Sequence, residues 1–144
     1  MKTVERPWFK ASKFLGICFG IPLTIIGLLT YIYWKNCALL INGLVWLFIS
    51  IAFLCKALLE YYKLKKLKDG GVKYKCKINR VILLNYVRFV PYIVSKVECT
   101  YENNGTTYEI LDGPYLLSPF EKLEKLSAFA YIGKNKNMLV LSRM

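Results

Sequence analysis

The side chains that could do chemistry in this chain are nine carboxylates and five cysteines, and the 144 residues include no histidine. Without histidine, the Ser–His and Cys–His nucleophile pairs cannot form. Glu98 and Glu109 could meet across a strand pair as an acid–base dyad, but surface carboxylates near lysines are far commoner. No GxxxxGKS loop or GxGxxG turn is present to hold a phosphate. The sequence therefore predicts a protein that is not an enzyme and has no cofactor.

The cysteines have neither the spacing of a disulfide framework nor that of a paired metal-ligand motif. They are Cys18, Cys37, Cys55, Cys76 and Cys99. We expect reduced thiols that act mainly as small buried hydrophobic side chains, and no metal site.

Two uncharged apolar stretches, residues 14–34 and 36–55, determine how the rest of the chain is interpreted. A helix needs about 20 mostly apolar residues to cross a bilayer, and both stretches reach that length. Lys35 alone separates them, so they must lie antiparallel as a hairpin. A buried helical pair in a soluble protein is the alternative. Tyr31-Ile32-Tyr33-Trp34 does not resemble the cleavage site of a signal peptide and instead suggests an interfacial aromatic belt.

Basic residues flank the outer ends of the hairpin, whereas its tip has only Lys35. These flanking residues are Lys2, Arg6, Lys10 and Lys13 on one side, and Lys56, Lys63, Lys65, Lys66 and Lys68 on the other. Because such segments tend to stay in the cytoplasm, both termini are expected there, with the protein in the cell (inner) membrane.

The predicted organisation has five parts. They are a basic cytosolic N-terminus (1–13), transmembrane helices at 14–34 and 36–55, a basic juxtamembrane helix ending in glycines (56–71), and a cytosolic β domain (72–144).

Gly16 and Gly20 form a GxxxG spacing in the first stretch, and Gly27 follows further along. Small residues on one face let two helix backbones approach closely. These three glycines are therefore the predicted helix-packing residues, either within the hairpin or in a dimer. Pro22 indicates a local bend in the same region.

The segment after the second stretch has helical spacing and many lysines, and Asp69-Gly70-Gly71 should end it. Lys63, Lys65, Lys66 and Lys68 are predicted to contact anionic lipid headgroups, unless they serve only to set topology. Nucleic acid is not an expected partner despite the net charge of +12. Much of the charge flanks the apolar stretches, and no recognition-helix motif, zinc finger or paired aromatic platform is evident.

Residues from 72 onward predict a small, mainly β domain of about five strands. Alternation of apolar and polar residues indicates strands at 72–84, 91–102, 106–111, 129–132 and 138–141. Asn104-Gly105 predicts a tight hairpin turn, and residues 133–137 predict another. Ser118-Pro119-Phe120-Glu121 resembles a capping box, so a short helix is expected from Pro119 to near Leu126. A barrel or a sandwich would accommodate these elements.

Three segments of this β region resemble known proteins. They are Gly71-Val72-Lys73-Tyr74-Lys75-Cys76-Lys77-Ile78, Tyr92-Ile93-Val94 and Tyr101-Glu102-Asn103-Asn104-Gly105-Thr106-Thr107-Tyr108. They resemble a family of small bacterial membrane proteins of unknown function, which implies transmembrane helices paired with a compact β domain. Tyr131-Ile132-Gly133 is similar to that family's closing strand pair, although the last turn here has no aspartate or proline. At the level of fold, the layout also resembles membrane-anchored barrels of the oligonucleotide-binding type.

The predicted function is that of a non-enzymatic membrane protein that presents a β domain at the cytoplasmic face. Its partner would be another membrane protein or a second copy of the chain. The alternative is an immunity-type protein that neutralises a membrane-active toxin.

Overall fold

The computed structural model describes residues 2–89 and 91–144, so Met1 and Val90, which belong to the predicted parts 1–13 and 72–144, lie outside the described residues. The chain divides into two compact units. One unit is Trp8–Glu60, and the other is Tyr61–Met144 together with the residues that precede Trp8. Each unit is described separately below.

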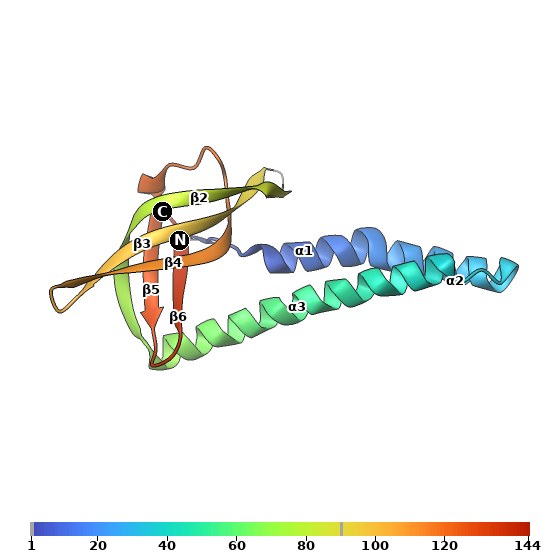
Figure 1. Cartoon of the computed structure of the whole chain (residues 1–144), viewed down its shortest axis with the longest axis horizontal. Coiled ribbons are helices and arrows are strands. Elements are labelled where there is room, and N and C mark those ends of the chain that lie inside the picture. The colour runs from blue at the N-terminus through green and yellow to red at the C-terminus, as the bar shows by residue number, and fades with distance from the viewer. Residues whose placement is uncertain (1, 90) are drawn as a thin grey trace. The chain divides into compact units, whose positions relative to one another are not determined.

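The first unit is a pair of helices. Helix α1 (Pro7–Leu15), a π-helical turn (Gly16–Gly20) and α2 (Ile21–Trp34) follow one another without a break. After a turn at residues 35–37, α3 runs from Ala38 to Gly70 (Figure 1). The first helix therefore begins at Pro7 rather than near residue 14. The apolar stretch 36–55 and the basic segment after it belong to one helix.

Pro22 explains the π-helical turn. Proline has no N–H group, and its ring would collide with the carbonyl group four residues earlier, that of Cys18. The chain avoids this collision by widening the preceding turn, so that the Ile21 N–H donates to the Gly16 carbonyl oxygen, five residues back. The structure thus accommodates Pro22 with a π-helical turn.

The turn between the helices uses left-handed backbone at Lys35, whose φ is 55°. The Lys35 N–H donates to the Tyr31 carbonyl oxygen at 2.9 Å, which ends α2. Asn36 then caps α3, because its side-chain Oδ1 accepts a hydrogen bond from the Ala38 N–H at 3.0 Å.

The second unit contains one six-stranded antiparallel sheet among the described residues. Its strands are β1 (Lys2–Thr3), β2 (Val72–Phe89), β3 (Tyr92–Asn103), β4 (Thr106–Leu117), β5 (Leu126–Ile132) and β6 (Asn137–Arg143), in the spatial order β1-β6-β5-β2-β3-β4. The sheet is not closed. The N-terminal segment, expected to be only a basic tail, supplies the edge strand β1.

Strand β2 joins the two halves of the sheet. Its residues from Val72 to Cys76 pair with β5, and from Lys77 onward it pairs with β3, with a register irregularity next to Asn79 (Figure 1). The predicted Asn104-Gly105 turn is confirmed. Asn103 pairs with Thr106, and both turn residues have positive φ, 51° and 77°. The predicted hairpin between β5 and β6 is confirmed as well.

Alternate residues of the strands form the core of this unit. Its buried members are Val4, Cys76, Val97, Cys99, Tyr115, Leu117, Leu126, Ala128, Ala130, Leu139 and Leu141. Val4 reaches this core because the Val4 N–H donates to the Leu141 carbonyl oxygen at 2.8 Å. Residues from both ends of the chain are therefore needed to complete the core.

The helix expected from Pro119 does not form. One half of the capping box is present, because the Ser118 N–H donates to Glu121 Oε2 at 3.2 Å. Ser118 Oγ accepts from the Phe120 N–H at 3.4 Å, and the Glu121 N–H donates to the Ser118 carbonyl oxygen at 3.1 Å. Only a single 3₁₀ turn, Leu123–Lys125, follows them. A local cap therefore forms, but the chain enters β5 at Leu126 before a helix can propagate.

Glu121 has a tertiary partner that explains this arrangement. The Arg143 guanidinium donates to both Glu121 carboxylate oxygens and, through Nη2, to the Leu116 carbonyl oxygen at 3.2 Å. Burial opposes the charge of Glu121, but the hydrogen bonds from Arg143 and from Ser118 together hold the pKa of its carboxyl group below the ordinary value. The ion pair therefore fixes the segment between β4 and β5 to the end of β6.

We expect Glu121→Gln to lower the free energy of unfolding by about 1–3 kcal/mol at neutral pH, since the lost hydrogen bonds involve charged groups. Because the folded-state pKa is lowered, the stabilisation is present above the ordinary glutamate pKa of about 4.3 and is lost as the pH falls toward the folded-state value. Unfolding of the detergent-solubilised chain between pH 7 and pH 3 measures this. A difference between the two proteins that stays constant down to pH 3 would contradict the assignment.

Candidate functional site

The three predicted packing glycines all lie against α3. A Cβ atom at Gly16 would come within 2.7 Å of Ser50 Oγ, one at Gly20 within 2.7 Å of Leu47 Cδ2, and one at Gly27 would overlap the backbone of Leu40. The partners on α3 run backward along the chain as the glycines run forward, which is the antiparallel arrangement of a hairpin. Within this chain, the glycine face is occupied by its own second helix.

The same contact line includes residues that the sequence analysis did not select. Ser12 Oγ donates to the Ser50 carbonyl oxygen at 2.9 Å, and Ser50 Oγ donates to the Ser12 carbonyl oxygen at 2.7 Å. A Cβ atom at Gly43 would meet the backbone of Leu23 and Thr24. Small residues four apart, Ser12, Gly16, Gly20 and Thr24, could have indicated this line. We call the contact of these residues and Gly27 with α3 the helix seam.

Gly27→Ala should destabilise the helix pair by about 1–3 kcal/mol, because the added methyl group meets backbone that cannot rotate away. Gly20→Ala is the matched control. There the nearest atoms belong to the Leu47 side chain, which can change rotamer. The midpoints of unfolding in detergent compare the two variants, and an equal or larger loss for Gly20→Ala would show that the seam is not closest at Gly27.

The four predicted headgroup lysines have different surroundings. Lys63 and Lys66 line a cavity in the second unit, together with Lys134 and Lys136 from the turn between β5 and β6. Lys68 Nζ lies 5.8 Å from the centroid of the Tyr131 ring, and Lys65 is exposed. This division depends on the contact of the end of α3 with a turn that is distant in the sequence.

The cavity has a volume of about 460 Å³. Leu67, which is buried, and Gly71 form part of its wall, and the Gly71 N–H donates to the Leu67 carbonyl oxygen at 2.8 Å. On the other side, the Gly133 N–H donates to the Lys136 carbonyl oxygen at 2.9 Å. A Cβ atom at Gly133 would come within 2.7 Å of Leu67 Cδ2, so the end of α3 and the β5–β6 turn are in close contact.

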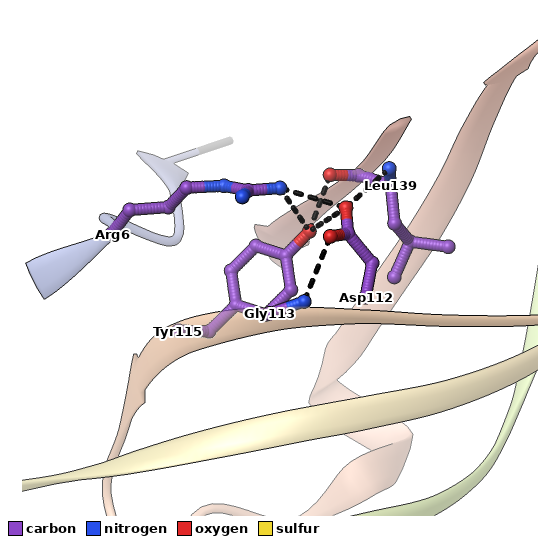
Figure 2. Close-up of polar contacts among 5 residues, drawn as sticks. All are labelled: Arg6, Asp112, Gly113, Tyr115 and Leu139. Carbon is purple, nitrogen blue, oxygen red and sulfur yellow. Dashed lines mark hydrogen bonds and ion pairs between the residues drawn. The ribbon is translucent and has the colours of Figure 1, made fainter. Parts of the chain in front are cut away.

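The most connected polar cluster of the second unit joins Arg6, Asp112 and Tyr115 (Figure 2). Asp112 Oδ2 accepts hydrogen bonds from Arg6 Nη2 at 2.7 Å and from the Leu139 N–H at 2.9 Å, and it lies 3.1 Å from the Tyr115 hydroxyl. Asp112 Oδ1 accepts from the Gly113 N–H at 2.8 Å. The Tyr115 hydroxyl also contacts the Leu139 carbonyl oxygen. The cluster links the N-terminal segment, β4 and β6.

An irregularity in β4 allows this convergence. Residues three apart on a regular strand point to opposite faces, yet Asp112 and Tyr115 meet at one site. The register between β3 and β4 shifts here, since Ser95 pairs with Tyr115 but Val97 pairs with Asp112. A backbone hydrogen bond from the Leu116 N–H to the Glu5 carbonyl oxygen, 3.0 Å long, joins the same two parts of the chain.

The chemistry of the cluster favours a structural role. Burial, reinforced by the Asp112 carboxylate, raises the pKa of Tyr115 well above its ordinary value, so the phenol stays neutral and acts as a hydrogen-bonding group. Both oxygens of Asp112 already accept hydrogen bonds from the protein. The Arg6 guanidinium also stacks on Tyr115, with its Cζ 4.9 Å from the ring centroid.

We expect Asp112→Asn to lower the free energy of unfolding by about 3–5 kcal/mol, because it removes a negative charge beside the largely buried Arg6 guanidinium. Glu98→Gln is the control. The Arg80–Glu98 ion pair has the similar length of 2.8 Å, but the Arg80 side chain is 69% exposed, so a loss of at most about 1 kcal/mol is expected. Denaturant unfolding in detergent tests both. Equal losses for the two variants would contradict the assigned role of the cluster.

The remaining candidates for chemistry have structural surroundings. Glu98 pairs with Arg80, and Glu109 lies opposite Thr100 in the sheet, so the two carboxylates do not form a direct cross-strand pair. Burial raises the pKa of Cys76, and burial with nearby charged groups raises that of Cys99 to about 12. Among the described residues, no group of three or more potential metal ligands is found.

One aromatic group was missed. The rings of Tyr74, Tyr101 and Tyr108 lie in contact across β2, β3 and β4. Tyr101 is stacked on Tyr108 with ring centroids 5.4 Å apart, and it is tilted against Tyr74 with centroids 5.1 Å apart. Tyr101 packs against the buried core, so the three rings extend that core along the β3–β4 hairpin. Their shared phase on the predicted strands was the available signal.

Comparisons of the chain with protein-family models, with curated proteins and with solved structures found no match. The resemblance to small bacterial membrane proteins stays a prediction from the sequence.

Proposed function

We propose that the chain is an integral membrane protein whose helix pair crosses the bilayer and whose sheet unit serves as a binding module at the cytoplasmic face. The observation that carries this proposal is the exposure of the two long helices. Pro7–Trp34 and Ala38–Gly70 are long and apolar enough to span a membrane, and only 17% and 11% of their most apolar windows are buried within the protein. A core helix of a soluble protein would be mostly buried.

The positions of the basic residues support a single orientation. Lysines and arginines flank the outer ends of the helix pair, and the turn between the helices has only Lys35. On the positive-inside rule, both termini and the sheet unit are then cytoplasmic.

The partner in the membrane would be another membrane protein or a second copy of this chain. The small residues of the helix seam contact the chain's own α3, so such a partner would meet other faces of the helices. Exposed side chains such as Ile25, Leu44 and Phe48 are available there.

The proposal assigns no catalytic role. Asp112 and Tyr115 are held in a structural cluster, Glu98 and Glu121 are paired with arginines, and the chain contains no histidine. A binding role is consistent with these arrangements.

The double variant Leu44→Lys/Phe48→Lys tests the membrane placement. These side chains are 51% and 75% exposed, so lysines there would be harmless in water, whereas each costs about 2.5–3.5 kcal/mol near the centre of a membrane helix. We expect the variant to be lost from the alkali-resistant membrane fraction of expressing cells. Leu111→Lys/Phe120→Lys, at 55% and 92% exposed sites of the sheet unit, should stay in that fraction. A soluble parent protein, or identical behaviour of both variants, would contradict the proposal.

A further inference from the structure

We propose that the cavity between the end of α3 and the β5–β6 turn binds a phosphate group carried by a small molecule or a lipid headgroup. The cavity lies wholly within the second unit and is lined by Lys63, Lys66, Lys134 and Lys136, with Asn135 beside them. Its volume of about 460 Å³ falls within the range of small-molecule sites. That volume exceeds what a single small ion needs, so we expect the ligand to be a molecule larger than a free phosphate ion.

The charge of the lining is the main argument. Four lysines contribute to one cavity, and the described residues that line it include no aspartate or glutamate. An anion bound in the cavity would be attracted by the positive charges of all four side chains. A phosphate matches such a site well, because it has up to two negative charges and three acceptor oxygens. Lysine is an established phosphate ligand, acting as a point charge.

The walls of the cavity are fixed by close backbone contacts. A Cβ atom at Gly71 would lie 2.6 Å from the Leu67 carbonyl oxygen and 2.9 Å from that of Ile132. One at Gly133 would lie 2.7 Å from Leu67 Cδ2. Glycine at both positions allows the end of α3 to approach the turn closely, and these contacts hold the backbone that carries the lysines in place. Such preorganisation lowers the entropic cost of binding.

The shape of the site favours one phosphate-bearing group over an extended polyanion. The lysines surround a single cavity and do not form a continuous stripe along a strand or helix. Nucleic-acid sites instead track several phosphates along a groove. Free organic phosphates and phospholipid headgroups share the chemistry that the cavity would recognise. The lipid source rests on the proposed membrane placement, whereas the soluble source does not.

The neighbouring lysines provide matched controls for a binding experiment. Lys65 is exposed and does not line the cavity, although it precedes Lys66 directly. Lys65→Gln and Lys66→Gln therefore remove the same charge from adjacent positions on one helix. Lys134→Gln removes a charge from the other side of the cavity. Thermal unfolding of each variant establishes that all of them fold.

The test measures binding of inorganic pyrophosphate to the full chain in a neutral detergent, by calorimetric titration. We expect saturable binding with one site per chain. The affinity should fall at least about fivefold in Lys66→Gln and in Lys134→Gln and change by less than about twofold in Lys65→Gln. Absence of saturable binding would overturn the proposal, as would equal losses at Lys65 and Lys66. Tighter binding of a single-stranded oligonucleotide that all three substitutions weaken equally would also overturn it.

A second arm identifies the source of the phosphate. The titration is repeated with the chain in phosphatidylcholine nanodiscs that contain either phosphatidic acid or oleate at equal surface charge. Suppression of pyrophosphate binding by phosphatidic acid beyond that by oleate would support a lipid headgroup as the occupant. Equal effects of the two additives would support a soluble phosphate. The detergent titration needs no membrane orientation, so a failure of the proposed topology would leave its result standing.

Discussion

The exposed apolar surface of the two long helices is the constraint on which the rest of the molecule depends. About four fifths or more of each apolar window has no cover within the protein, and water would disfavour such a surface by about 25 cal/mol for each Å². A bilayer removes this cost and at the same time removes the hydrophobic drive for the helices to associate. With the proposed placement in a membrane, close backbone packing and the reciprocal Ser12–Ser50 hydrogen bonds along the helix seam would supply that association instead.

The carboxylates and the lysines of the sheet unit have different surroundings. Asp112 and Glu121 pair with Arg6 and Arg143, and each pair links segments that are far apart in the sequence. These ion pairs lie where the open sheet brings β4 near β6 and the N-terminal segment. Asp112 and Glu121 therefore stabilise the fold by joining these distant segments. No aspartate or glutamate is among the described residues that line the cavity with the lysines of α3 and the β5–β6 turn, and the proposed binding of an external anion rests on this difference.

Local signals predicted much of the fold. The uninterrupted apolar stretches gave the two helices, Asn104-Gly105 gave the β3–β4 turn, and Gly16, Gly20 and Gly27 lie where a close helix contact requires small residues. The features that the sequence did not predict depend on residues that are far apart in the chain. Arg6 and Asp112 are 106 residues apart, so no local pattern relates them. Ser118 and Glu121 satisfy a capping pattern whose helix is prevented by the partner at Arg143 and by the early start of β5. The cavity likewise requires a helix end and a turn more than sixty residues apart, Lys66 and Lys134 among them.

Thiol labelling in intact cells tests the membrane hairpin most directly, because Cys37 is an exposed native cysteine in the turn between the helices. A membrane-impermeant maleimide should label Cys37 from outside the cell, and Cys37→Ser should abolish that labelling. Thr106→Cys, placed at an exposed site beside the β3–β4 turn in the Cys37→Ser background, should react only after the cells are permeabilised. Labelling of Thr106→Cys in intact cells, or protection of Cys37 until permeabilisation, would contradict a hairpin that crosses the membrane with its sheet unit in the cytoplasm.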